Sequence, residues 1–447
     1  TYTDLLQYAG PVQSSLREVM SWNRQDYWFP EIRSLGGAIL VMTLVLYPYV
    51  YLLARAAFLS QSSCLLDVSR TLGRNPWRHF IEVAVPMARP AIAAGIALAL
   101  METMADFGTV QYFGISTFTT GIYRTWFALG EPIAAAQLAA MLMLFVLTML
   151  WIERKGRSGA HYDHTTAMRP LTSYELTGGR RTGAAIACFA PIFLGFGLPL
   201  LILGKLAWGK TSGLFDTRFL ALAWNSFTLA AIASLVTVGV AVLVAYGMRL
   251  RPTGLMQAAS RVASLGYAIP GTVIAVGVLI PFARFDNLLN GWMQAQFGLS
   301  TGLVLTGTII GLLFAYLVRF LAVALNSVEA GFGKINRNLD DAARTLGQPP
   351  GGTLRKVHLP LLRGAMLTGL VIVFVDVLKE LPATLILRPF DVETLAVRVY
   401  QYASDERLAE AAVPALAIVA VGILPVVLLS RAIARSRPRN DAGPIDG

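Results

Sequence analysis

Charged residues are scarce in this sequence. Asp, Glu, Lys and Arg together make up 14% of the 447 residues, whereas 55% are hydrophobic. A soluble domain of ordinary composition carries roughly a quarter charged residues. The shortage excludes an ordinary soluble domain of this length and indicates that lipid is the solvent for much of the surface.

Cysteine and histidine are also rare. The chain has two cysteines, Cys64 and Cys188, and four histidines. Two cysteines without a pairing pattern provide neither a disulfide framework nor a cysteine-ligated metal site. His161 and His164 lie close together, but two histidines without further ligands are more often solvated than metal-bound. We therefore expect no metal site in this chain.

Long hydrophobic runs, by contrast, are abundant. A helix needs about 20 predominantly apolar residues to cross a bilayer. Uninterrupted runs favour helices over a transmembrane barrel, whose strands alternate in short segments. The sequence predicts an all-α integral membrane protein with about nine spans, at residues 36–58, 88–112, 133–152, 183–207, 219–248, 262–283, 301–325, 364–387 and 411–430.

The formal net charge is +11, and basic proteins often bind nucleic acid. The positions of the charges argue against that interpretation. When the segment after residue 58 is assigned to the cytoplasm and the sides alternate, most Lys and Arg residues between the spans fall on the inner side. This is the positive-inside bias of membrane proteins. The charge therefore sets topology, and we expect no nucleic-acid partner.

One segment of the sequence occurs twice. Residues 67–73 read DVSRTLG and residues 341–347 read DAARTLG, an offset of 274. We expect this offset to hold without a gap for some sixty residues, so that it aligns Pro86 with Pro360, Gly95 with Gly369, Thr120 with Thr394 and Arg124 with Arg398. Accidental similarity between apolar helices would not align polar, Gly and Pro positions, so we infer an internal duplication.

Six predicted spans separate the two copies, which places both on the same side of the membrane and makes the repeats parallel rather than inverted. The second copy shows six spans and the first only three, so we expect the first module to be truncated before Thr1. The basic segment between them is predicted to be a linker. The expected organisation is a first permease module at 1–152, a cytoplasmic linker at 153–182, a second module at 183–434 and a cytoplasmic tail at 435–447.

Each copy predicts a short surface helix, a turn and a second short helix before the next span. The acid at its start, Asp67 or Asp341, suits the positive end of a helix dipole. The glycine six residues later, Gly73 or Gly347, favours a left-handed C-cap that ends the helix. Aliphatic positions and a proline follow at the same spacing in both copies. Such a helix–turn–helix would present a rigid knob at the membrane surface.

This pattern resembles the EAA loop of ABC importer permeases, written EAA, three residues, Gly, nine residues, I-x-L-P. In that family, which has the type I importer fold, the loop is a coupling helix that docks in a cleft of a separate ATP-hydrolysing subunit. The resemblance implies two such interfaces, formed by Asp67, Arg70, Thr71, Leu72, Gly73, Arg74 and Pro86 in the first copy and by Asp341, Ala343, Arg344, Thr345, Leu346, Gly347 and Pro360 in the second.

The copies depart from the family pattern in two respects. Both have Asp in place of Glu, and the first has Val68 and Ser69 in place of two alanines. The alternative interpretation is an amphipathic re-entry helix that packs on the bundle. Two copies at identical spacing on one side of the membrane favour the coupling role.

One string, from Gly204 to Thr211, matches the P-loop pattern of Gly, four residues and Gly-Lys-Thr. It follows an apolar helix rather than a strand, and Lys205–Trp208 cannot supply the small-residue loop that wraps a phosphate. We interpret it as a chance match. The chain is therefore expected to be non-catalytic and without a cofactor of its own, with ATP and Mg bound by a cytoplasmic ABC ATPase dimer.

The predicted span after each copy contains two acids one turn apart. Residues four positions apart share a helix face, and acids within a span usually face a cavity, a partner or a pathway. A structural polar cluster is the alternative, with Lys379 neutralising an acid near a break in the helix. We predict a translocation pathway, with gating more than cargo coordination as the role, lined by Glu102, Asp106, Asp376, Glu380 and Pro382.

The stretch 379–384, Lys-Glu-Leu-Pro-Ala-Thr, together with 106–109, Asp-Phe-Gly-Thr, is similar to fused two-module permeases of ferric-iron ABC importers. Fused permeases for thiamine or phosphonates share the architecture and are alternatives. An ion-driven secondary transporter is a rival of another class. The resemblance implies a bacterial inner-membrane location and a periplasmic solute-binding protein that docks on the outer segments 113–132, 208–218 and 388–410.

Overall fold

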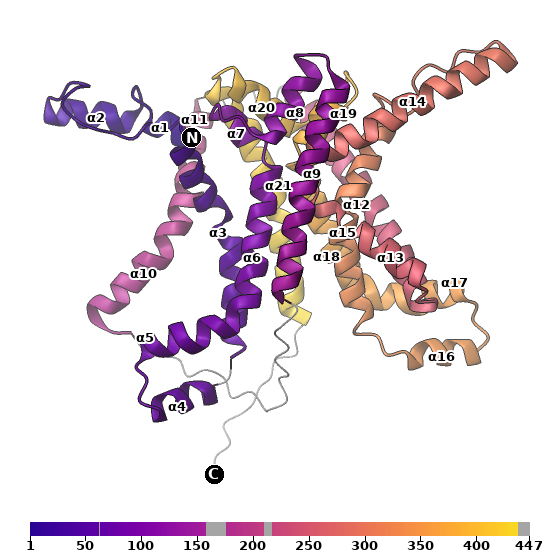
Figure 1. The fold of residues 1–447 in the computed structure, drawn as a ribbon, viewed down its shortest axis with the longest axis horizontal. Coiled ribbons are helices and arrows are strands. Elements are labelled where there is room, and N and C mark those ends of the chain that lie inside the picture. Colours follow the sequence, from indigo (N-terminus) through magenta and orange to yellow (C-terminus); the bar gives the residue numbers. More distant parts are fainter. Residues whose placement is uncertain (62, 158–175, 210–216, 437–447) are drawn as a thin grey trace. The chain divides into compact units, whose positions relative to one another are not determined.

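The computed structural model describes residues 1–447 apart from 62, 158–175, 210–216 and 437–447 (Figure 1). Every regular element in the described part is helical, which confirms the all-α class. The chain divides into two compact units, Thr1–Lys205 and Leu206–Gly447, and each is considered by itself. His161 and His164, with most of the predicted linker and tail, lie outside the described residues.

The first unit is built on the long helices α3, α6 and α9, with short helices at their ends. A π-helical turn, η1, leads into α6, and a second one, η2, joins α10 to α11. The elements are α1 (Tyr2–Leu6), α2 (Pro11–Met20), α3 (Leu35–Leu59), α4 (Ser63–Thr71), α5 (Pro76–His79), η1 (Phe80–Ala84), α6 (Val85–Ala105), α7 (Gly108–Tyr112), α8 (Phe118–Phe127), α9 (Pro132–Arg157), α10 (Gly178–Ile192), η2 (Phe193–Gly197) and α11 (Leu198–Trp208).

The second unit centres on α12, α15 and α18, which pack on one another. The largest fully buried side chains of its core include Tyr316, Leu312 and Leu325 on α15 and Leu362 on α18. The elements are α12 (Thr217–Leu250), α13 (Gly254–Ala263), η4 (Gly266–Ala268), α14 (Gly271–Phe297), α15 (Ile309–Phe332), α16 (Asn338–Thr345), α17 (Pro350–Thr353), η5 (Leu354–His358), α18 (Leu359–Leu378), α19 (Pro382–Leu387), α20 (Leu395–Ser404) and α21 (Leu408–Ser436).

Among the described residues, eight helices are long and apolar enough to cross a membrane, and the shorter apolar part of α21, Leu408–Ile423, stands in the place of the last predicted span. The multi-pass class is therefore confirmed. Some boundaries differ because the chain breaks at polar and proline positions: Asp106 is extended, with ψ 135°, and Pro382 begins a new helix. The predicted spans 88–112, 262–283, 301–325 and 364–387 become Pro76–Ala105, Gly271–Phe297, Ile309–Phe332 and Pro350–Leu378.

The duplication is visible in the helices. The elements α3, α5, η1, α6 and α7 begin 274 residues before α15, α17, η5, α18 and α19. The offset then changes. The side chain of Thr117 caps α8 and that of Thr394 caps α20, three residues beyond the position that an offset of 274 assigns to it. The gapless alignment of Thr120 with Thr394, and of Arg124 with Arg398, was therefore wrong, because the second copy has a longer loop before α20.

Glycine allows the paired helices of each copy to approach closely. A Cβ placed on Gly95 of α6 would lie 2.7 Å from the Cα of Val50 on α3. At the repeat-equivalent Gly369 of α18, a Cβ would lie 3.4 Å from Ser327 Cβ on α15. The same helix pair is thus packed in both copies, more tightly in the first.

The boundary between the compact units lies at residue 205, later than the predicted module boundary at 183. The helix Gly178–Trp208 packs on the first unit, since Gly195 lies against the backbone carbonyl of Leu44 and the Tyr2 hydroxyl donates to the carbonyl oxygen of Leu194 at 2.5 Å. Packing and repeat order therefore divide the chain at different places. The predicted module boundaries describe the order of the repeated spans, not the packing, and they stay a prediction.

Candidate functional site

The first repeated loop consists of α4, a turn at Gly73 and α5. Gly73 has φ 72°, the left-handed conformation predicted for it. Asn75 then begins α5 by accepting a hydrogen bond from the backbone N–H of Arg78. Large apolar side chains are exposed around the turn, with Leu72 at 72% and Trp77 at 74%. Asp67, Thr71 and Arg74 are also exposed. The loop therefore carries an apolar tip bordered by charge.

The second loop has the same construction from α16, Gly347 and α17. Gly347 again has φ 72°. Leu346 is 79% exposed, whereas Ala343 is buried against the unit. Asp341 and Arg344 are both exposed and lie 3.5 Å apart as an ion pair along one helix turn. Of the predicted second-copy residues, Asp341, Arg344, Thr345, Leu346 and Gly347 are thus accessible to a partner and Ala343 is not.

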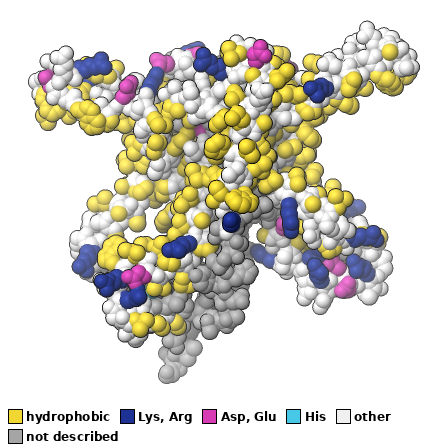
Figure 2. All heavy atoms as spheres, in the orientation of Figure 1, with side chains coloured by type: hydrophobic (Ala, Val, Ile, Leu, Met, Phe, Trp, Pro, Cys, Tyr) yellow, Lys and Arg dark blue, Asp and Glu magenta, His cyan; other side chains and the backbone are white. Residues whose placement is uncertain are grey.

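Basic side chains are concentrated over both loops. In the space-filling view, the surface over the long helices of each unit is mostly hydrophobic, and Lys and Arg side chains collect over the loops (Figure 2). Exposed basic residues there include Arg74, Arg78, Arg337, Arg344, Arg355 and Lys356. This distribution is the one that the positive-inside rule places on the cytoplasmic side.

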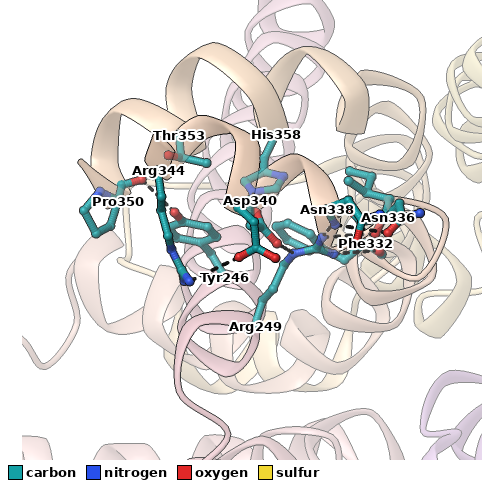
Figure 3. A network of polar contacts seen from close by, with 12 residues as sticks. Tyr246, Arg249, Phe332, Asn336, Asn338, Asp340, Arg344, Pro350, Thr353 and His358 are labelled. Atoms are coloured by element: carbon teal, nitrogen blue, oxygen red, sulfur yellow. Dashed lines mark hydrogen bonds and ion pairs between the residues drawn. The ribbon is translucent and has the colours of Figure 1, made fainter. Parts of the chain in front are cut away.

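A buried polar network that the sequence analysis missed anchors the second loop (Figure 3). Arg249, near the end of α12, makes four hydrogen bonds. Its Nε donates to Asp340 Oδ2 at 2.8 Å, and its Nη atoms donate to the backbone carbonyls of Phe332, Ile335 and Asn336 at 3.0, 3.0 and 3.2 Å. The arginine therefore caps backbone carbonyls at the end of α15 and fixes the position of the start of α16.

A buried histidine completes the network from the other side. His358, in η5, lies 2.5 Å from Asp340 Oδ1 through its Nε2. The rings of Tyr246, Phe332 and His358 pack together, and the Tyr246 hydroxyl donates to the carbonyl of Pro350 at 2.7 Å. In the sequence, the network was signalled only by the acid pair Asp340–Asp341. The motif drew attention to Asp341, which is exposed, whereas Asp340 makes the buried contacts.

Pro86 and Pro360 lie at the starts of α6 and α18, each directly after a π-helical turn. A proline cannot donate the usual backbone hydrogen bond, and a π-helical turn, which is rare, occurs mostly as a single turn within a helix. The two prolines therefore mark the joint between each loop and its span. They are not at the exposed tips.

The predicted pathway acids at the span ends cap the helices that follow them. Asp106 accepts from the backbone N–H groups of Thr109 and Val110, both at 3.0 Å. Glu380 accepts from the N–H groups of Ala383 and Thr384 at 3.1 and 3.0 Å. Each acid therefore satisfies the free donors at the start of α7 or α19.

Glu380 has a further partner, Arg319 on α15, which the sequence analysis also missed. The Arg319 Nη1 atom lies 3.1 Å from Glu380 Oε1, and both side chains are largely buried. Close by, the Tyr316 and Thr384 hydroxyls lie 2.6 Å apart. Asp376 pairs with Lys379 at 3.0 Å, as the structural alternative expected.

The remaining predictions are placed as follows. Glu102 is half-buried on α6, and Pro382 begins α19. Gly204 lies within α11, whereas Lys210 and Thr211 of the P-loop-like string fall outside the described residues. In the part of the chain that the structure describes, no group of three or more His, Cys, Asp or Glu residues is placed to hold a metal ion.

Comparison with known proteins gives the class of the chain. The family described as "Binding-protein-dependent transport system inner membrane component" matches residues 28–154 and 237–439, which is more than half of the chain. The chain belongs to this family. It is a multi-pass inner-membrane permease component of a binding-protein-dependent ABC importer.

Three similar proteins carry the names of iron or phosphonate transport systems. The chain is 27% identical over 404 residues to "Fe(3+)-transport system permease protein FbpB 2" of Haemophilus influenzae, covering 88% of this chain and 76% of the relative. It is 26% identical to "Putative ferric transport system permease protein FbpB 1" of the same organism and spans 58% of that protein's length. It is 26% identical over 265 residues to "Putative 2-aminoethylphosphonate transport system permease protein PhnV" of Salmonella typhimurium, covering 56% of this chain and 94% of the relative.

Proposed function

We propose that this chain is the membrane-spanning subunit through which an ABC importer takes up ferric iron, driven by ATP hydrolysis on a separate subunit. The observation that carries the proposal is the matched pair of exposed loops, α4–α5 and α16–α17. Each has an apolar tip, Leu72 or Leu346, beside a glycine with φ 72°. An exposed apolar side chain held on a rigid turn has the properties of an anchor for a protein partner.

The proposed cycle is mechanical. ATP and Mg bind to a dimer of the cytoplasmic subunit, whose closure moves the two loops and opens the permease outward. A periplasmic binding protein then delivers the cargo, and hydrolysis returns the permease to its inward state. In this scheme the chain itself performs no covalent chemistry and needs no cofactor.

The proposed pathway follows the ends of α6 and α18, where Glu102, Asp106, Asp376, Glu380 and Pro382 lie. The hydrogen bonds of Asp106 and Glu380 to the following helices support a gating role more than direct cargo coordination, because the carboxylate oxygens already have donors. A carboxylate that shapes a helix break can alter the width of a route without binding what passes.

Iron is supported as the cargo by the extent of the similarity. The match to the protein named as a Fe(3+)-transport system permease covers 88% of this chain. The match to the protein named as a phosphonate-system permease covers 56%. Phosphonate is therefore the second candidate cargo, with thiamine as a further alternative from the shared architecture. An ion-driven secondary transporter needs no docking loops, so the two exposed knobs argue against it.

Replacement of the loop glycines tests the proposal. Gly73→Asp and Gly347→Asp place a charged side chain at exposed positions with positive φ, where a Cβ meets nothing within 4 Å. Gly298→Asp is the matched control, since Gly298 also has positive φ and open space but ends α14 at the other end of the second unit. We expect co-purification of the ABC ATPase to fall at least fivefold in both loop variants and to stay at the parental level in the control.

The cargo is tested separately, in cells that depend on this permease. We expect uptake of radiolabelled ferric iron, and no competition from excess 2-aminoethylphosphonate. Competition by the phosphonate would replace iron as the cargo and leave the coupling role intact. Full retention of the ATPase by both loop variants would overturn the coupling role itself.

A further inference from the structure

We propose that Arg249 is a positioning residue that links the second of the two force-receiving loops to its own unit, so that movement of α16 is passed directly to α12. This inference rests on the proposed coupling function and adds to it the residue that passes the movement on. The juxtaposition that carries it is Arg249 of α12, Asp340 of α16 and His358 of η5, three elements that meet at one buried point (Figure 3).

Arg249 joins α12 to the end of α15 and the start of α16 through hydrogen bonds, and this set of bonds is called the tie below. Its guanidinium is 10% exposed and donates to one carboxylate and three backbone carbonyls. The three carbonyls belong to Phe332, Ile335 and Asn336, the end of α15 and the link to α16. The planar arginine fork fixes its donors in direction. The start of α16 therefore cannot shift relative to α12 without breaking several hydrogen bonds.

Asp340 is held on both oxygens. Oδ2 accepts from Arg249, and Oδ1 lies against Nε2 of His358, whose side chain is fully buried. His358 is the last residue before α18, so the carboxylate also connects α16 to the span that follows the loop. Because α12, α15 and α18 pack on one another, the loop is tied to the centre of its own unit.

The first copy has other residues at the positions of Asp340 and His358. The repeat offset places Leu66 at the position of Asp340 and Ala84 at that of His358, and neither side chain can accept from an arginine or pair with a charge. Two of the contacts described at the first loop and the segment that follows it are a hydrogen bond and an ion pair. Gln61 Nε2 donates to the carbonyl of Ala84 at 2.9 Å, and the Arg74–Glu82 ion pair is more than two-fifths exposed on both sides. Exposed ion pairs contribute little.

The consequence is direct transmission of movement from the second loop to its spans. A push on α16 therefore moves α12 and α18 as a body. The exposed surface that a partner contacts, around Leu346, does not include Arg249.

The test uses the permease in complex with its ABC ATPase and compares three variants. Arg249→Gln removes the tie. Arg251→Gln is the matched control, the same change at an exposed arginine two residues further along the chain. Leu346→Asp changes the exposed tip and leaves the tie in place. The readouts are the amount of ATPase that co-purifies, amide hydrogen exchange over 338–347 and 240–250, and ferric iron uptake per ATP hydrolysed.

For Arg249→Gln we expect ATPase association within twofold of the parent, at least tenfold faster exchange in 338–347 and at least a fivefold loss of uptake per ATP. Trapping with ATP and vanadate should change exchange in both segments of the parent, and only in 338–347 of this variant. Arg251→Gln should match the parent. If Arg249→Gln does not fold, Asp340→Asn, which keeps the arginine's bonds to the backbone carbonyls, should show the same effects at about a third of the size.

Unchanged exchange or unchanged uptake per ATP in Arg249→Gln would overturn the inference. Loss of ATPase association in this variant would do so as well, because the tie would then shape the docking surface rather than transmit force. A different result would show that the proposed coupling function is wrong. In that case Leu346→Asp would retain the ATPase, whether or not Arg249→Gln changes hydrogen exchange and uptake per ATP.

Discussion

Gly73 and Gly347, at equivalent positions of the two repeats, adopt the same left-handed backbone conformation, with φ 72° at both. A Cβ on either residue would meet no atom within 4 Å. Packing therefore does not require glycine at either position. The backbone does, because each loop ends one short helix and reverses into the next at this residue.

Substitutions at Gly347 should separate backbone strain from surface chemistry. Gly347→Val forces a β-branched residue into positive φ, at a cost of about 1–3 kcal/mol, whereas asparagine enters this region more readily. We expect Gly347→Val to reduce ATPase co-purification and to increase hydrogen exchange in 338–347, and Gly347→Asn to stay close to the parent. Equal losses in both variants would show that side-chain size, and not conformation, matters at this position.

The paired glycines Gly95 and Gly369 should respond differently to alanine. At Gly95 the new Cβ would lie 2.7 Å from a backbone Cα of α3, so the helices must separate. Overpacking of this kind costs about 1–3 kcal/mol. At Gly369 the nearest atom is 3.4 Å away, close to ordinary contact. We expect thermal unfolding in detergent to shift down clearly for Gly95→Ala and little for Gly369→Ala; the reverse order would contradict the packing.

Glu380 and Arg319 should show strong coupling in a double-mutant cycle. Glu380→Gln leaves Arg319 largely buried without its counter-charge, and removing one partner of a buried pair costs about 3–5 kcal/mol. Replacing both residues, as Arg319→Met with Glu380→Gln, should recover much of this loss. Thermal unfolding of the four proteins measures the coupling energy.

Asp106→Asn is the comparison in the first copy, where the described contacts of the acid are hydrogen bonds to the next helix and asparagine also caps helices well. We expect a change below about 1 kcal/mol. Additive effects of Arg319→Met and Glu380→Gln would show that the ion pair does not stabilise this part of the fold.

Asp286 should control the loop between α14 and α15. Its carboxylate is fully buried within α14 and accepts from the backbone N–H groups of Leu305 and Thr306 at 3.1 and 2.7 Å. Asp286→Ala removes the acceptor of two part-buried backbone donors, at a cost of up to about 1–3 kcal/mol each. We expect faster proteolysis within 298–308, with Asp391→Ala, at an exposed position on another loop, as the control. Unaltered cleavage would mean that the loop is held by other contacts.

Much of the site could be predicted from local pattern. The acid, the glycine and the proline of each loop have conformational preferences that act over a few residues, so their spacing predicts a helix, a turn and a second helix. Exposure of Leu72 and Leu346 follows from the same geometry. Asp106 and Glu380 were found because acids are costly in apolar spans, but their hydrogen bonds to the next helix depend on where the helix breaks.

The residues that pattern missed act across long sequence distances. Arg249 and Asp340 are 91 residues apart, and Arg319 and Glu380 are 61 apart. In the sequence, Arg249 stands out only as one of several basic residues between spans, and Asp340 only as the neighbour of the acid of the motif. No spacing rule connects such residues, since their contact depends on how α12, α15 and α18 pack.

The amino-acid sequence by itself determined the membrane class, the helical spans, the duplication and the two loops. These follow from hydropathy, charge position and local backbone preference, which act over one helix or less. Only the tertiary structure decided which acid of the second loop is buried, which arginines hold it and Glu380, and how closely each pair of helices packs. Those choices depend on side chains brought together from distant segments, where burial makes an unpaired charge costly and so selects its partner.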